Sequence, residues 1–240
     1  MDVPVAARRF ASRAAYESKT IVAMYPAIAL PLARARGRNH PIGPDTEMVI
    51  EGFPRSATSF AVAAFQMAQD RKVNIAHHTH SPAQVIDAVR RGIPTLLLVR
   101  APEDAILSHL VRRPDLTAGQ GLRGYVRFHR PLVRYRRSVV VGTFDQAVTQ
   151  FGDLMREVNE TFGTSFTPFE HTPENVQRCM ETIDGYVRRN HPPERVEMVV
   201  PRPSAERNAH KDSLRPAYHS ASLAPLRAHA EALYEQFASG

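Results

Sequence analysis

The amino-acid sequence predicts an α/β fold in which helices flank both faces of a parallel β-sheet within a single domain. From residue 46 onwards, short apolar segments alternate with longer segments of helical periodicity, and this alternation is typical of parallel strands joined by right-handed crossovers. A chain of 240 residues is long enough to form one complete core. The single cysteine, Cys179, has no partner for an internal disulfide, which favours a reducing, cytoplasmic setting.

The local sequence predicts each element in turn. Strands are expected at residues 47–52, 73–77, 94–100 and 138–143. Helices are expected at residues 57–70, 82–91, 102–113, 119–136 with a bend near Pro131, 145–161, 172–189 and 222–237. Ser81 before Pro82 and Asp145 are typical helix N-caps, and Gly163 is a typical C-terminal stop. The proline-rich residues 191–204 predict a surface connection.

The chain is basic, with a net charge of +7 and an isoelectric point near 10. Such a charge suits nucleic acid, an anionic membrane or a polyanionic small ligand. However, the charge is spread along the chain, and only three of the 31 basic residues are lysines. A general bias towards arginine explains the charge equally well, so composition does not choose the partner.

Residues 1–46 form an N-terminal segment ahead of the main α/β region at 47–240. Its apolar stretch, residues 20–32, is shorter than the ~20 residues that span a bilayer and contains two prolines. We expect this basic, helical segment to pack on the main domain. The alternative is that residues 1–36 lie on a membrane surface or close over an acceptor site.

The most informative segment is MVIEGFPRSATSF, residues 48–60, in which an apolar strand passes through a Gly-Phe-Pro turn into a hydroxyl-rich helix start. The first turn of a helix has backbone N–H groups without intrahelical partners and lies at the positive end of the helix dipole, so it binds phosphate or sulfate. Side-chain donors are added there by Arg55, Ser56, Thr58 and Ser59. The segment lacks the G-x-x-x-x-G-K-[ST] spacing of nucleoside triphosphatases.

A second informative segment is LLLVRAPEDAILSHLVRR, residues 96–113. Arg100 ends the third strand, Ser108 lies on the helix that follows, and ligands of open α/β sheets bind at the carboxyl ends of adjacent strands. Arg100 offers a planar donor fork to a phosphate, and Ser108 offers a hydroxyl. The alternative is that Arg100 pairs with Glu103 or Asp104.

Together these segments resemble the P-loop sulfotransferases, of the bacterial type, that use 3′-phosphoadenosine 5′-phosphosulfate (PAPS) as donor. GFPRSATSF, residues 52–60, is similar to the 5′-phosphosulfate loop of that family, and RAPEDAILS, residues 100–108, is similar to its 3′-phosphate element. HTHSP, residues 78–82, resembles a Lys-Thr-His-x-Pro segment whose histidine is the catalytic base. The resemblance covers residues 47 to about 145 and implies a P-loop-type sheet.

The resemblance implies a role for each matching residue. His80 would accept the proton of the acceptor hydroxyl, and Arg55 would neutralise the transferred sulfuryl group. The 5′-phosphosulfate would be bound by Arg55, Ser56, Ala57, Thr58, Ser59 and Phe60. The 3′-phosphate would be bound by Arg100 and Ser108, with Arg207 and Lys211 in place of a C-terminal Arg-Lys-Gly signature that this chain lacks. The acceptor would be a hydroxylated small molecule, lipid or glycan, with no metal and no nucleic acid involved.

Two positions, Ala57 and His78, depart from the family pattern, and a third, His80, has an alternative role. Ala57 replaces a glycine, which fits if its backbone has a negative φ. His78 replaces a lysine, so one contact to the donor is lost or depends on pH. Since many carbohydrate sulfotransferases use a carboxylate as base, His80 has a supporting role if this chain does the same. His78 and His80 also share one side of an extended segment, but no third metal ligand is identifiable in the sequence.

Two other functional classes remain as alternatives. The first is a nucleotide-binding or nucleic-acid-binding protein in which the phosphate loop and arginines serve binding alone. The second is a P-loop kinase-like phosphotransferase, which requires a Walker lysine and a metal-holding acidic residue that this sequence does not supply convincingly.

Overall fold

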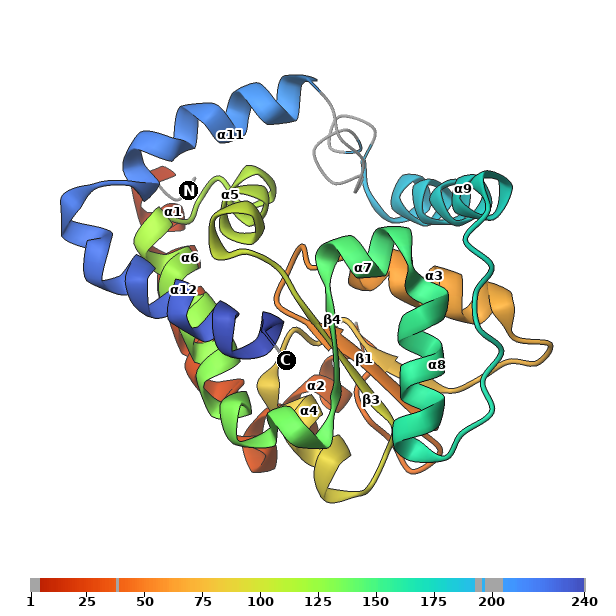
Figure 1. The fold of residues 1–240 in the computed structure, drawn as a ribbon. Coiled ribbons are helices and arrows are strands. Elements are labelled where there is room, and N and C mark those ends of the chain that lie inside the picture. Colours follow the sequence, from red (N-terminus) through yellow and green to blue (C-terminus); the bar gives the residue numbers. More distant parts are fainter. Residues whose placement is uncertain (1–4, 38, 193–195, 197–204, 240) are drawn as a thin grey trace.

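The computed structural model describes residues 5–37, 39–192, 196 and 205–239, and it confirms the predicted α/β fold class (Figure 1). All strand pairs in the sheet are parallel. In chain order the strands are β1 (Met48–Gly52), β2 (Ile75–His77), β3 (Thr95–Val99) and β4 (Val140–Thr143), and in space they follow the order β2-β1-β3-β4. The order reverses between β1 and β3, and ligands of such sheets bind in the crevice at this switch point.

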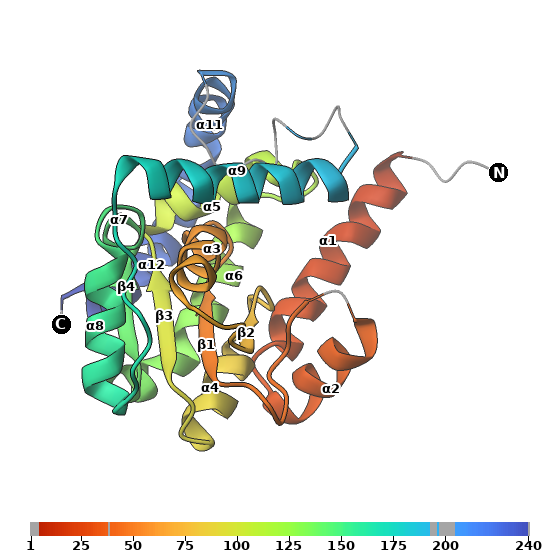
Figure 2. The same cartoon turned by 90° about the vertical axis from the view of Figure 1, so that its right-hand side faces the viewer.

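Helices cover both faces of the sheet because the strands are apolar on both sides (Figures 1 and 2). On β3, Leu96 and Leu98 face one layer, whereas Leu97 and Val99 face the other. The first layer contains α3 (Thr58–Ala68), α8 (Phe151–Phe162) and α9 (Pro173–Asn190). The second layer contains α4 (Pro82–Arg90), α5 (Pro102–Arg112), α6 (Ala118–His129) and α12 (Ala224–Ala238). The remaining elements of the main region are η1 (Arg130–Ser138), α7 (Phe144–Thr149), α11 (Ala205–Tyr218) and η2 (Ala221–Leu223).

Some element boundaries differ from the predictions for local reasons. The helix expected at 145–161 is divided into α7 and α8 at Gln150, and α7 is capped by Thr143, which forms a capping box with Gln146, and not by Asp145. The helix expected to bend near Pro131 instead ends at His129 and continues as the 3₁₀ helix η1, since proline cannot donate the next helical hydrogen bond. Most of the expected connection at 191–204 lies outside the described residues.

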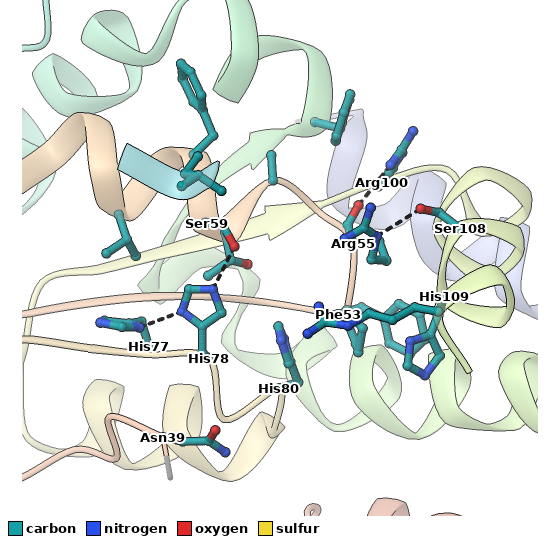
Figure 3. A pocket seen from close by; sticks show the side chains of 18 of the residues that line it. Asn39, Phe53, Arg55, Ser59, His77, His78, His80, Arg100, Ser108 and His109 are labelled. Carbon is teal, nitrogen blue, oxygen red and sulfur yellow. Dashed lines mark hydrogen bonds between the residues drawn. The ribbon is translucent and has the colours of Figure 1, made fainter. Parts of the chain in front are cut away.

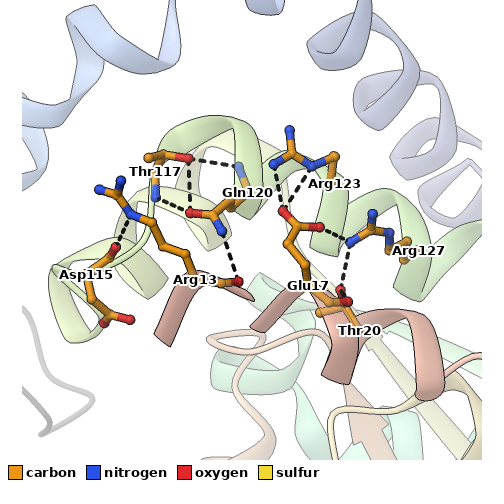
Figure 4. A network of polar contacts seen from close by, with 8 residues as sticks. All are labelled: Arg13, Glu17, Thr20, Asp115, Thr117, Gln120, Arg123 and Arg127. Atoms are coloured by element: carbon orange, nitrogen blue, oxygen red, sulfur yellow. Dashed lines mark hydrogen bonds and ion pairs between the residues drawn. The ribbon is translucent and has the colours of Figure 1, made fainter. Parts of the chain in front are cut away.

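The N-terminal helices α1 (Val5–Val22) and α2 (Pro26–Arg36) lie beside the second layer, and α1 is bound to α6 by a polar network (Figure 4). The Glu17 carboxylate accepts hydrogen bonds from Arg123, at 2.6 Å, and from Arg127. The Arg13 guanidinium donates to the carbonyl oxygen of Asp115 at 2.8 Å. Within the described part of the chain, no helix is long and apolar enough to cross a bilayer. Membrane contact through residues 1–36 stays a prediction.

Candidate functional site

A cavity of about 1380 Å³ lies at the carboxyl ends of β1, β2 and β3. Its walls come from the loops after these strands and from helices that include α1, α3, α5, α6, α7, α9 and α11. Pockets for one small ligand usually have volumes of ~300–1,000 Å³. The cavity therefore has room for two substrates side by side.

The loop after β1 is shaped by close approach and by unusual backbone angles. A Cβ atom at Gly52 would lie 2.6 Å from the carbonyl oxygen of Leu98, so only glycine fits there. The prediction that Ala57 has a negative φ is wrong: its φ is 68°, and it precedes α3, which begins at Thr58. An alanine in this left-handed region costs roughly 1–2 kcal/mol. The surrounding loop must supply that energy.

Positive φ angles recur next to the cavity. Among the described non-glycine residues they occur at Arg55 and Ala57 after β1, and at His78 and His80 after β2. Strained backbone of this kind persists where the surrounding structure holds it, and it is concentrated at functional sites. Both loops therefore contribute strained backbone to the cavity wall.

The residues expected at the phosphate end are brought together by direct hydrogen bonds (Figure 3). Arg55 Nε donates to the Ser108 hydroxyl at 2.9 Å, and Arg100 Nη1 donates to the carbonyl oxygen of Arg55 at 3.0 Å. The Arg100 guanidinium also lies 3.8 Å from the ring centroid of Phe144. Glu103, one of the alternative partners for Arg100, pairs with Arg215 instead.

Helix α11 contributes Arg207 and Lys211 to the cavity lining, and these are the two residues that the sequence analysis assigned to the phosphate end. Burial and the nearby charges of Arg207, Arg112 and Arg100 lower the pKa of Arg55 to about 9. Burial, followed by the charge of Arg100, also lowers the pKa of Lys211. Cations that depress one another in this way are stabilised when an anion lies between them.

The hydroxyl residues of the loop have different environments. The Thr58 hydroxyl lines the cavity, is buried and has no hydrogen-bond partner among the described residues, which suits a ligand oxygen. Ser56 is completely buried and is not among the described residues that line the cavity, so the structure does not place its side chain at the predicted phosphate contact. Ser59 is hydrogen-bonded to His78 Nε2 at 3.0 Å. Phe60 packs against Phe169 and also lines the cavity.

His80 has a defined tautomer. Its Nδ1 lies 2.8 Å from the carbonyl oxygen of Gly52, and because a carbonyl only accepts, Nδ1 carries the proton. Nε2 is then left with a lone pair. Burial, followed by the charge of His78, lowers the pKa of His80 well below its usual value. The ring is therefore neutral at physiological pH and can accept a proton at Nε2.

The sequence reasoning missed Glu51, which organises this part of the site. Its fully buried carboxylate accepts hydrogen bonds from the Thr79 backbone N–H at 3.0 Å, the Thr79 hydroxyl at 2.6 Å and the Gln84 amide at 3.0 Å. Burial raises the pKa of Glu51 to about 7. Since Glu51 binds the residue next to His80, it positions that histidine. The sequence signal that could have identified Glu51 is a charged residue within the apolar run MVIEG, residues 48–52.

No aspartate or glutamate occurs among the described residues that line the cavity. A carboxylate base therefore has no candidate in this part of the chain. His77 Nδ1 lies 2.6 Å from His78 Nδ1, and within the described ranges no group of three or more His, Cys, Asp or Glu side chains is placed to hold a metal ion. Metal-free chemistry stays a prediction.

Comparisons with protein-family models, with curated proteins and with solved structures found no match to this chain. The resemblance to sulfotransferases therefore depends on the motif residues and their arrangement.

The histidines predict that the protein loses stability in mild acid. Burial is the main cause that lowers the pKa of His77 and His109 to about 3, of His78 and His129 to about 4, and of His80 well below 6.5. The unfolded chain protonates these rings near pH 6.5, so below that pH it binds more protons than the folded chain and the free energy of unfolding decreases. We expect a lower thermal midpoint at pH 5 than at pH 7 in circular dichroism melts.

Two carboxylates with shifted pKa values also change the free energy of unfolding with pH, so they limit the pH range over which the melts report on the histidines. Glu51 has a raised pKa, so between pH 4.5 and about 7 the folded chain holds up to one proton more at this residue than the unfolded chain does. Glu51 therefore opposes the loss of stability that the histidines cause in acid. The pKa of Asp115 is lowered from 3.8, mainly by its hydrogen bond with Arg113. The stability that Asp115 contributes is therefore lost only below pH 3.8, outside the range between pH 5 and pH 7. An equal or higher midpoint at pH 5 would contradict the histidine assignment.

Proposed function

We propose that this protein is a PAPS-dependent sulfotransferase that transfers a sulfuryl group to a hydroxyl of a small-molecule, lipid or glycan acceptor. The observation that carries the proposal is the hydrogen-bonded set Arg55, Ser108 and Arg100 at the sheet switch point, on the same cavity as His80. A cationic phosphate end and a neutral imidazole are the two components that such a transfer needs.

The donor fits the cationic end of the cavity. Arg100, Ser108, Arg207 and Lys211 bind the 3′-phosphate, because they converge on one wall and no described lining residue is acidic. The start of α3 and the Thr58 hydroxyl bind the 5′-phosphosulfate, since the helix N-terminus attracts anions. This arrangement leaves the His80 side of the cavity for the acceptor.

In the proposed reaction the acceptor oxygen forms a bond to sulfur as the bond from sulfur to the bridging phosphate oxygen breaks. The acceptor proton moves to Nε2 of His80, and adenosine 3′,5′-bisphosphate leaves with the electron pair of the broken bond. The Arg55 guanidinium neutralises the negative charge on the bridging and sulfuryl oxygens. The protein contributes positioning and charge stabilisation, without a covalent intermediate.

Calorimetric titration with adenosine 3′,5′-bisphosphate and with adenosine 5′-phosphate tests the donor site. The additional 3′-phosphate is expected to tighten binding by at least tenfold, and equal affinity for the two nucleotides would contradict the proposal. Incubation of cell extracts with sulfur-labelled PAPS and the protein then tests transfer and identifies the acceptor class. Tight bisphosphate binding without any labelled product would favour the nucleotide-binding alternative.

Arg100→Met is expected to weaken the binding of adenosine 3′,5′-bisphosphate by roughly 10- to 150-fold, because a charged hydrogen bond contributes ~1.5–3 kcal/mol. Calorimetry measures the change. Arg156→Met is the matched control, since Arg156 is an exposed residue on α8 that pairs with Asp153. If Arg100→Met binds the bisphosphate as well as the control does, Arg100 does not contact the 3′-phosphate.

A further inference from the structure

The cavity is also lined by two cations from other helices, Lys19 on α1 and Arg112 on α5, and by His109 on α5, whose imidazole is neutral. The charge of Arg112 also acts on Arg55, so this part of the cavity adjoins the proposed phosphate end. Figure 2 shows α1 on the β2 side of the molecule, apart from α11, which carries the candidate 3′-phosphate residues. We call Lys19, His109 and Arg112 the acceptor wall.

Helix α1 is held against this part of the cavity by the loop that contains His80. The Ser81 hydroxyl donates to the carbonyl oxygen of Ala23 at 2.8 Å, and the Ala83 N–H donates to the same oxygen at 3.1 Å. The Ser81 hydroxyl is therefore used to fix α1 instead of capping its own helix. Lys19 lies one turn before Ala23, on the stretch of α1 that lines the cavity.

Lys19 has no salt bridge or hydrogen bond to any described residue through its side chain. Its side chain lines the cavity together with His80 and His109, and its charge contributes to the lowered pKa of both rings. The Glu51 carboxylate attracts the Lys19 charge without contacting it. Its oxygens already accept hydrogen bonds from Thr79 and Gln84. The Lys19 charge thus faces the cavity without a carboxylate in contact.

His109 also has unused hydrogen-bonding capacity. Its side chain lines the cavity, only 7% of the residue is exposed, and neither ring nitrogen has a hydrogen-bond partner among the described residues. The rings of Tyr16 and Phe53 flank it, each with a centroid distance of 5.9 Å. An unsatisfied imidazole N–H is costly when buried, and a ligand oxygen would satisfy it.

We propose that the acceptor wall binds an anionic group of the acceptor, so that the substrates are hydroxylated compounds that also carry a carboxylate, phosphate or sulfate. The anionic group lies against Lys19, Arg112 and His109 while the hydroxyl meets Nε2 of His80. Aromatic side chains beside the wall, Tyr16, Phe53 and Phe128, suit a flat apolar body between the two groups. This inference rests on the proposed sulfotransferase function.

The test uses 4-hydroxybenzoate and its neutral methyl ester as matched probes, titrated into the protein saturated with adenosine 3′,5′-bisphosphate. The carboxylate is expected to bind at least tenfold more tightly than the ester. Lys19→Met is expected to remove that preference, and Lys19→Arg is expected to retain most of it. Lys72→Met is the control, because Lys72 is an exposed lysine outside this cavity.

Three results would overturn the inference: equal binding of acid and ester, an unchanged preference in Lys19→Met, or no binding of the carboxylate at millimolar concentration. Thermal melts of each variant show whether the fold is intact. Repeating the titration without nucleotide separates the two proposals. If the bisphosphate itself does not bind, the sulfotransferase proposal fails, whereas Lys19-dependent carboxylate binding still supports an anion site at the acceptor wall.

Discussion

Arg55→Ala is expected to lower turnover by about 10²–10³-fold, the usual cost of removing one group that stabilises charge in a transition state. Arg55 is the central cation of the site, because its Nε binds Ser108 and its carbonyl oxygen accepts from Arg100. Steady-state assays with saturating PAPS measure the effect. A variant with the wild-type rate would remove Arg55 from the mechanism.

The stability of the same variant separates a catalytic role from a structural one. Burial and three neighbouring arginines lower the pKa of Arg55 to about 9, so its charge opposes folding. We therefore expect Arg55→Ala to have a thermal midpoint no lower than that of the wild type. Arg55→Lys retains the positive charge but loses the planar fork, and we expect it to recover part of the rate. A large fall in the midpoint would instead indicate a structural role.

His80→Ala is expected to lower kcat by about 10²–10⁴-fold, the range for loss of a general base. The affinity for adenosine 3′,5′-bisphosphate should change little, because the proposal places His80 on the acceptor side of the cavity. His229→Ala is the control, since His229 is an exposed residue on α12. A full rate in His80→Ala would assign the base to another group.

The pH profile gives a second readout for His80. Because burial lowers its pKa well below 6.5, the wild-type kcat should stay constant as the pH falls through 6.5. An acid limb centred near 6.5 would show that the base has an ordinary histidine pKa, in conflict with the lowered pKa of His80. Thermal melts over the same range distinguish this limb from the loss of stability expected in acid.

Much of the fold was predictable because its elements depend on local patterns. A few adjacent residues were enough to predict β1 and β3, which are apolar runs, and the start of α4 at Ser81-Pro82. The division of α7 from α8 was missed because Thr143, Gln146 and the distorted backbone at Gln150 compete locally with a continuous helical pattern.

The Ala57 backbone shows why the loop itself was harder to predict. Alanine disfavours a positive φ, so sequence preference pointed to the ordinary helical region. The structure has a φ of 68° there, and neighbouring Arg55 has a φ of 75°. The hydrogen bond from Arg100, which is distant in sequence, to the backbone carbonyl oxygen of Arg55 helps to hold this loop, and no local rule contains it.

By itself, the sequence determined the alternation of strands and helices, the loop at residues 48–60 that we propose to bind an anion, and the candidate residues Arg55, Arg100, Ser108 and His80. The tertiary structure alone decided which of these residues touch, the tautomer of His80, and the presence of Glu51, Lys19 and His109 beside them. The physical reason is that a periodic pattern reports burial along one element. Contacts between β1, α1 and α5 depend instead on strand order and on how each helix packs across the sheet.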